Sequence, residues 1–126
     1  MTEPIWLSID LITAIHEEQL REFGGAGGLR DAGALESALA RPLNRYHYGT
    51  EDLAALAAAY GFGLSRNHAF VDGNKRTAFL AIVTFLGFNG VEFSVPEAEV
   101  AVMMLALASG EIDEEGLARW LRDNWP

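Results

Sequence analysis

Apolar residues recur along this chain at the spacing of helices. Between Ser8 and Phe23 most of them fall roughly on one face, and Ser8 is a residue type that commonly caps a helix N-terminus. β-branched residues do not alternate with polar ones over any long stretch, and alanine, a strong helix former, is abundant. The pattern therefore predicts an all-α protein.

Capping residues, glycines and prolines divide the pattern into six predicted helices. They run from Ser8 to about Phe23, from Asp31 to the residue before Pro42, from Thr50 to about Arg66, from Gly73 or Asn74 to the residue before Asn89, from Pro96 through Ala108, and from Asp113 to near Arg122. Residues 42–49 read as a loop and residues 91–95 as a short extended segment. Because no repeat or linker interrupts the chain, we expect one domain over residues 1–126.

The fourth predicted helix should be the central one. From Ala78 to Phe88 it is apolar all round, apart from Thr84 and Gly87. A helix without a polar face is normally wrapped by other helices, so we expect the core to hold its N-terminus rigidly. The helix that contains residues 100–108 is also apolar, and the sequence leaves open whether it lies in the core or in a dimer contact.

Composition and charge exclude several classes of protein. The chain has 126 residues, with nine basic and eighteen acidic side chains and a net charge of −9, so a general nucleic-acid binder is not expected. The absence of cysteine excludes disulfides, thiolate zinc sites and cysteine nucleophiles. The N-terminal residues do not resemble a signal peptide, and the longest apolar run is too short to cross a membrane. These features predict a cytoplasmic protein with no membrane or nucleic-acid partner.

Residues 68–76 break a local rule of helix composition. Lys75 and Arg76 fall in the first turn of the fourth helix, where the helix dipole disfavours each cation by roughly 0.3–1 kcal/mol. Free N–H groups at a helix start bind anions, and Gly73 would allow a ligand to approach the backbone closely. The sequence therefore predicts an anion site at the start of this helix.

The residues just before this helix extend the predicted chemistry. Asp72 is suited to hold a Mg²⁺ ion that bridges to phosphate oxygens, and a neutral His68 is suited to take a proton from a hydroxyl. Phe70 is expected to point into the core and fix the loop. Taken alone, His68 is more often a cap or a surface residue, Asp72 with Gly73 fits a simple turn and N-cap, and residues 74–76 fit a solvated first turn. Together, within nine positions, they favour a phosphoryl- or nucleotidyl-transfer site.

Other motifs are weaker. Residues 16–20 lack the second histidine of a metalloprotease motif and should be an exposed helix face. Residues 24–28, with four glycines, follow no strand and favour a flexible connection over a dinucleotide fingerprint. Tyr46, His47 and Tyr48 fit either loop packing or a mobile lip over the site. Met103 and Met104 are expected in the core.

The segment from His68 to Ala78, HAFVDGNKRTA, resembles the signature of the Fic/Doc superfamily, and specifically that of its Doc (death-on-curing) branch. The resemblance extends from about Pro4 to Trp120. It also rests on Phe-Gly-Gly at 23–25, Gly-Leu-Arg-Asp at 28–31, residues 35–42 and the Asn89–Gly90 pair. It implies a small helical bundle in which the signature occupies a loop and the N-terminus of the central helix.

The resemblance also implies a role for each residue of the signature. His68 would be the general base and Asp72 the Mg²⁺ ligand. The phosphates of a bound ATP would be held by the four residues that follow, namely Gly73, Asn74, Lys75 and Arg76. Residues 43–49 would correspond to the flap that positions the target segment.

Two departures from the signature bear on the reaction. AMP-transferring members have a second glycine where this chain has Lys75, and a second arginine where it has Phe79. The resemblance to the Doc branch implies instead a kinase that uses Mg-ATP and phosphorylates a threonine of elongation factor Tu, which arrests translation. Protein adenylylation by the same site is the alternative. A catalytically inactive antitoxin-binding module is a further alternative, from another class of function.

Control of such a toxin would come from a second protein. The nearest match to the inhibitory motif of self-controlled members is Thr13–Glu17, but Glu18 follows where glycine or asparagine is required. The resemblance therefore implies a cognate antitoxin whose C-terminal segment folds as a helix into a groove of this chain.

Overall fold

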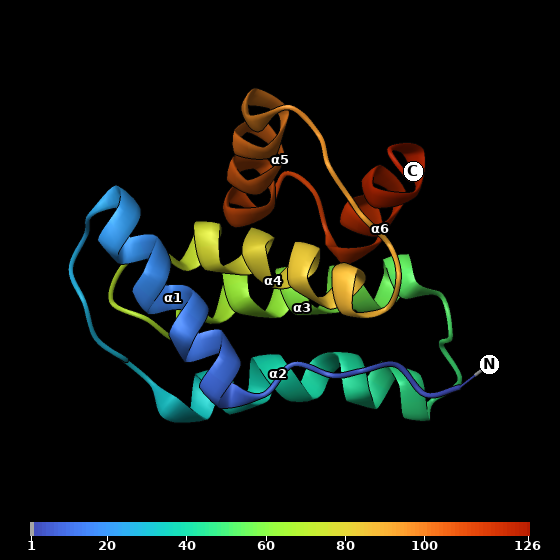
Figure 1. Cartoon of the computed structure of the whole chain (residues 1–126), viewed down its shortest axis with the longest axis horizontal. Coiled ribbons are helices and arrows are strands. Elements are labelled where there is room, and N and C mark those ends of the chain that lie inside the picture. The colour runs from blue at the N-terminus through green and yellow to red at the C-terminus, as the bar shows by residue number, and fades with distance from the viewer. Residues whose placement is uncertain (1) are drawn as a thin grey trace.

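The computed structural model describes residues 2–126, and this part of the chain contains six helices (Figure 1). They are α1 (Ile9–Phe23), α2 (Ala32–His47), α3 (Leu53–Asn67), α4 (Asn74–Phe88), α5 (Glu97–Ser109) and α6 (Glu114–Asp123). No strand occurs in this part of the chain, where the only β-type pairing is an isolated antiparallel bridge between Leu29 and Phe70. The prediction of an all-α protein is confirmed.

Side-chain caps begin four of the helices. Ser8, Asp31 and Asp113 cap α1, α2 and α6 as predicted, each accepting a backbone N–H in the first turn. The prediction that Thr50 caps the third helix is wrong. That helix begins at Leu53, and the carboxylate of Asp52 accepts the N–H of Ala54 at 3.1 Å.

The predicted end of the second helix before Pro42 is also wrong, because α2 continues through this proline to His47. An internal proline removes one helical hydrogen bond and costs about 3 kcal/mol in an isolated helix. Here, burial of Pro42 and ion pairs from Arg41 and Arg45 to Glu114 of α6 offset that cost. Tertiary contacts therefore decide the helix boundary.

The extension of α2 changes the interpretation of residues 43–49. Tyr46 lies inside the helix and packs edge-on against Trp6, with ring centroids 5.5 Å apart. The end of α2 and the start of α4 lie at opposite ends of the long axis of the molecule (Figure 1). Residues 43–49 therefore form neither a lip nor a flap over the start of α4, and both expectations are wrong.

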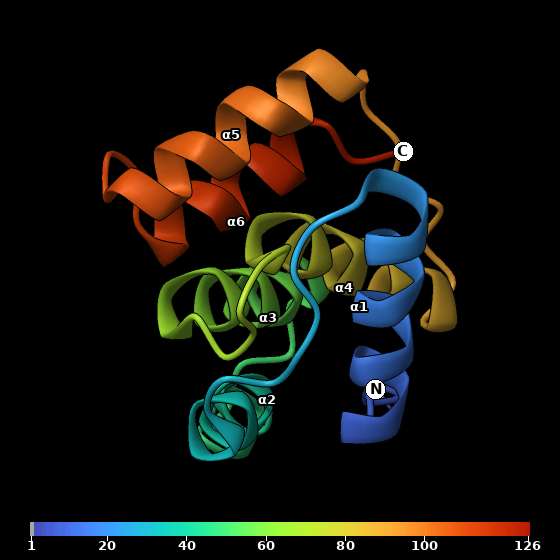
Figure 2. The same ribbon diagram turned by 90° about the vertical axis from the view of Figure 1, so that its left-hand side faces the viewer.

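The innermost helix is α3 rather than α4. Nearly all of α3 from Ala54 to Ser65 is buried, whereas α4 leaves Leu80 and Phe88 exposed. In Figure 2, α2 lies below α3 and α4, and α5 and α6 lie above them. Small residues explain the difference: a Cβ added at Gly63 of α3 would lie 3.2 Å from the Cα of Ala38 in α2. Close approach of neighbouring helices buries α3 more completely than apolarity alone predicts.

Helix α5 is apolar on every side from Val100 to Ala108 but lies at the edge of the bundle. Of its side chains only Met104 and Leu107 are buried, Met103 is half-buried, and Val102 and Leu105 are 70% and 61% exposed. One side of this helix thus joins the core and the other does not. None of the helices within residues 2–126 is both long and apolar enough to cross a membrane.

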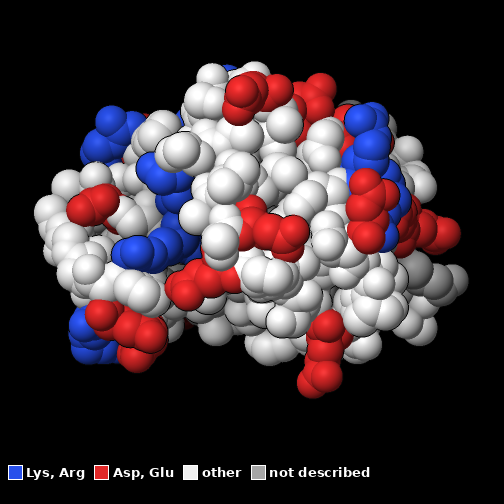
Figure 3. All heavy atoms as spheres, turned by 90° about the horizontal axis from the view of Figure 1, so that it is seen from above, with Lys and Arg blue, Asp and Glu red and all other residues white. Residues whose placement is uncertain are grey.

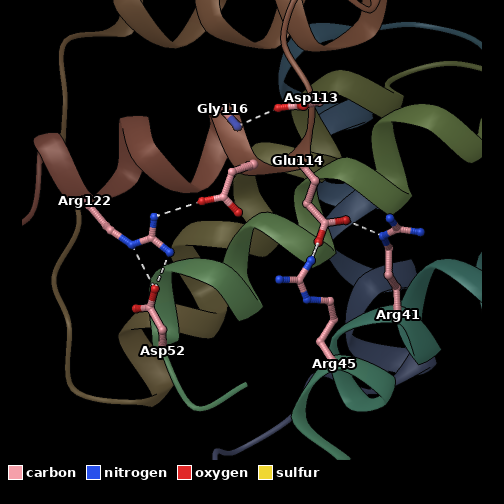
Figure 4. A network of polar contacts seen from close by, with 8 residues as sticks. Arg41, Arg45, Asp52, Asp113, Glu114, Gly116 and Arg122 are labelled. Carbon is pink, nitrogen blue, oxygen red and sulfur yellow. Dashed lines mark hydrogen bonds and ion pairs between the residues drawn. The ribbon is translucent and has the colours of Figure 1, made fainter. Parts of the chain in front are cut away.

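Ion pairs fasten α6 to the rest of the bundle (Figure 4). Glu114, at the start of α6, accepts hydrogen bonds from Arg41 and Arg45 of α2. Near the other end of the helix, Arg122 pairs with Asp52, the cap of α3, at 2.5 Å. Glu114 is nearly buried, so its two arginine partners compensate for the desolvation of its carboxylate.

A buried tyrosine joins α3 to the N-terminal segment. The hydroxyl oxygen of Tyr60 accepts the N–H of Leu7 at 3.0 Å, and the Tyr60 side chain is fully buried. Burial raises the pKa of Tyr60 to about 12, because the phenolate would lose its hydration, while the hydrogen bond from Leu7 acts weakly in the opposite direction.

This shift predicts a loss of stability at high pH. The folded protein keeps the Tyr60 proton up to about pH 12, whereas the unfolded chain releases it near pH 10. The contribution is thus fully present below pH ~10 and is lost between pH ~10 and ~12, by about 2–3 kcal/mol. Urea unfolding across this range should show a steeper decline for the wild type than for Tyr60→Phe. Equal declines would contradict the assignment.

Candidate active site

The predicted signature residues lie at the start of α4, where the C-terminal ends of α1 and α3 also meet. Helix α3 ends at Asn67, residues 68–73 form a short connection, and α4 begins at Asn74. In Figure 1 this connection is the yellow-green segment beside the C-terminal half of α1. The site is thus built from three helix ends and the loops between them.

His68 terminates α3 in an unusual backbone conformation. Its φ of 48° and ψ of 50° are left-handed, and no other non-glycine residue within residues 2–126 has a positive φ. This conformation costs about 1–2 kcal/mol for an ordinary side chain. The imidazole is exposed and makes no hydrogen bond with the described residues, so it is available to a ligand.

Residues 28–31 lie against the connection from its outer side. The N–H groups of Arg30 and Asp31 both donate to the carbonyl oxygen of Ala69, at 2.7 and 3.0 Å, and the N–H of Val71 donates to that of Gly28 at 3.1 Å. Residues 24–28, interpreted from the sequence as a flexible connection, lie outside any helix or strand, and the segment ends in this backbone pairing at Gly28. A pairing this short has no strand pattern that could be recognised in the sequence.

Helix α1 supports the connection from the opposite side. His16 donates from Nε2 to the carbonyl oxygen of Asp72 at 2.7 Å, and its ring stacks on Phe70 with centroids 3.7 Å apart. Phe70 is buried, as predicted. The prediction that residues 16–20 form an exposed face holds for Glu17 and Glu18 but is wrong for His16 and Gln19, which are both buried. Their spacing of three residues on the apolar side of α1 was the available signal.

Gly73 is required by two constraints at once. Its φ of 78° is left-handed, and the carboxamide of Gln19 packs directly against it. A Cβ at this position would lie 2.0 Å from Gln19 Nε2. Neither polar atom of Gln19 has a hydrogen-bond partner in the described part of the chain, which is uncommon for a buried amide.

A matched pair of glycine substitutions tests these constraints. Gly73→Ala should lower the free energy of unfolding by about 1–3 kcal/mol, because the new methyl group displaces Gln19 and strains the backbone. Gly87→Ala in the same helix is the control, since a Cβ there meets nothing within 4 Å and alanine favours helix. Urea unfolding measures both. Wild-type stability of Gly73→Ala would contradict the geometry.

The N-terminus of α4 lacks a side-chain cap. The side chain of Asn74 turns back to Phe70, accepting its N–H at 3.1 Å and donating to its carbonyl oxygen at 2.9 Å. The backbone N–H groups of residues 74–76 have no partner within residues 2–126. These three groups, which we call the anion cradle, can donate hydrogen bonds to a phosphate or another anion. Asn74 contributes to it through its backbone.

Asp72 lies beside the anion cradle. Its Oδ1 accepts the N–H of Gly73 at 2.8 Å, and its Oδ2 lies 3.4 Å from the N–H of Ala26. The carboxylate remains exposed. Within residues 2–126 no group of three acidic or histidine side chains forms a metal site by itself. A single carboxylate beside an anion site fits Mg²⁺, which commonly completes its coordination with phosphate oxygens and water.

Positive side chains lie at this end of the molecule despite the acidic composition, two of them in the first turn of α4. Arg30, Lys75 and Arg76 are exposed and take part in none of the ion pairs of the described chain. Arg76 stacks over Phe23 at the end of α1, with its guanidinium carbon 3.9 Å from the ring centroid. Figure 3 shows basic side chains on the side of the molecule where α4 begins, at the left of that view. This end is suited to bind an anion.

The predicted site residues therefore occupy the connection between α3 and α4 and the first turn of α4. His68, Asp72 and Gly73 lie on one short connection, and Lys75 and Arg76 follow in the first turn of α4. Sequence reasoning missed three residues that contact this connection from other elements, namely His16, Gln19 and Arg30.

Comparison with known proteins identifies the family. The chain belongs to the Fic/DOC family, whose model matches residues 6–86, well over half of its length. It is 35% identical over 118 residues to the protein kinase doc of Escherichia phage P1, a match that covers 92% of each chain. It is also 44% identical over 98 residues to the toxin Doc of Mycolicibacterium smegmatis, covering 72% of this chain and 75% of that protein. The family match contains the whole candidate site.

Proposed function

We propose that this protein is the toxin of a toxin–antitoxin pair and acts as a Mg-ATP-dependent protein kinase. The observation that carries the proposal is the uncapped start of α4, with unpartnered N–H groups, two first-turn cations, and His68 and Asp72 on the preceding connection. The similarity to a protein named as a kinase and to one named as a toxin supports it.

Each residue then has a distinct task. The anion cradle binds phosphate oxygens, Lys75 and Arg76 neutralise their charge, and Asp72 holds Mg²⁺. Bound Mg-ATP supplies the phosphoryl group. His68 accepts the proton of the target hydroxyl as its oxygen bonds to the γ-phosphorus and the bond from that phosphorus to ADP breaks.

Two side chains favour phosphate transfer over AMP transfer. Lys75 adds an exposed, charged side chain beside the anion cradle, where AMP-transferring members have glycine. Phe79, which replaces their second arginine, packs against the core and offers phosphate no donor. Protein adenylylation by the same site is the second candidate.

The proposed target is a threonine hydroxyl of elongation factor Tu, whose modification would arrest translation. Residues 43–49 cannot present such a target, because they lie far from the anion cradle (Figure 1). The segment that runs along His68 and its neighbours is residues 28–31, which we assign the positioning role. Its exposed residues lie next to the proposed base.

The proposed regulator is a cognate antitoxin with a helical C-terminal segment. Val102 and Leu105 give α5 an exposed apolar side, a surface whose chemistry suits an amphipathic helix.

Labelled ATP tests the reaction. Incubation with elongation factor Tu should transfer label from the γ position and none from the α position. His68→Ala should slow transfer on the order of 10²–10⁴-fold, because the base is lost. Mass spectrometry of the target distinguishes an added phosphate from an added AMP.

Two results would contradict the kinase proposal. Transfer of the α label identifies an adenylyltransferase. No transfer of either label, together with growth arrest that is unchanged by His68→Ala, identifies a catalytically inactive antitoxin-binding module.

A further inference from the structure

The left-handed backbone of His68 sets the direction of its Cα–Cβ bond. Among the described residues His68 takes part in a side-chain hydrogen bond only through its carbonyl oxygen, so none fixes the exposed imidazole. Its Cα–Cβ bond leaves a left-handed backbone, which an isolated chain would abandon for a more stable conformation. Some contact must therefore stabilise this conformation.

Arg30 makes that contact. Its Nε donates to the carbonyl oxygen of His68 at 2.9 Å, while its own N–H donates to the next carbonyl oxygen, that of Ala69, at 2.7 Å. Two donors of one residue thus engage two consecutive peptide groups. They restrict the rotation of both peptides about the Cα of Ala69 and hold the carbonyl side of His68.

The position of Arg30 is itself fixed. The next residue, Asp31, caps α2 by accepting the N–H of Ala34 at 3.0 Å, and its N–H also donates to Ala69. Arg30 therefore connects the rigid start of α2 to the end of α3. Its guanidinium is exposed and in no ion pair of the described chain, so a need for charge pairing does not explain the residue.

We propose that Arg30 is a positioning residue for His68, and that it acts through the Nε–H hydrogen bond to the His68 carbonyl. This inference rests on the proposed role of His68 as the general base. It differs from a role in phosphate binding, in which the charge of the guanidinium would matter and the Nε–H bond would not. The two roles predict opposite outcomes for conservative substitutions.

Three substitutions separate the donor from the charge. Glutamine places its amide nitrogen at the same distance along the side chain as arginine Nε, so Arg30→Gln keeps a donor and removes the charge. Lysine keeps the charge but has a methylene at that position, and methionine has neither donor nor charge there. Arg66→Met is the matched control, because Arg66 stacks over Phe62 at the end of α3 and makes no hydrogen bond to the connection.

We expect kcat for phosphate transfer to fall about 10- to 100-fold in Arg30→Met and Arg30→Lys, the loss expected for a hydrogen bond from a charged donor. Arg30→Gln should keep most of the wild-type kcat. The KM for ATP should change little in all three. In the free protein, NMR signals of the His68 ring should move in the Met and Lys variants and stay in place in Arg30→Gln and Arg66→Met.

Other outcomes overturn the inference. If Arg30→Lys keeps activity while Arg30→Gln loses it and has a raised KM for ATP, Arg30 would be assigned to phosphate binding. Wild-type kcat and unmoved His68 signals in every variant would leave Arg30 no role in positioning. Failure of the wild type to transfer phosphate, or full activity of His68→Ala, would instead refute the proposed function, while the NMR comparison would still decide whether Arg30 positions His68.

Discussion

The candidate site depends on the backbone pairing between residues 28–31 and 68–71. Three backbone N–H groups, those of Arg30, Asp31 and Val71, donate hydrogen bonds in this pairing, and the Nε–H of the Arg30 side chain donates a fourth. Together they hold the connection between α3 and α4 from outside. From inside, His16 and Gln19 of α1 hold the same connection. Residues far apart in the sequence thus fix the direction in which α4 begins, and with it the direction in which its unpartnered N–H groups point.

Several unfavourable local features meet at this place. A histidine is left-handed, a helix begins without a side-chain cap and with two cations, and the amide of Gln19 is buried without a partner. Each costs free energy at this place. The well-packed α3 and the ion pairs of α6 supply the stability that tolerates them. An anion bound at the start of α4 would relieve the second of these features, because it would pair with both the free N–H groups and the two cations.

The sequence predicted most of the features whose determinants are local, although the cap of the third helix is Asp52 and not Thr50. The caps Ser8, Asp31 and Asp113 were predictable because a cap acts within one helical turn. The site segment was predictable because its residues are consecutive. Pro42 inside α2 and the central place of α3 were not, since contacts with other helices decide both. His16 and Arg30 act on residues 56 and 38 positions away, a separation that no local pattern records.

The proposed function requires the N–H groups at the start of α4 to bind the phosphates of ATP. The most direct measurement is the backbone amide NMR spectrum of the protein as Mg-ATP is added. The largest shifts are expected at Asn74, Lys75 and Arg76, and they should saturate as the Mg-ATP concentration rises. Saturable shifts confined to another part of the chain, or no shifts at these three amides, would contradict it.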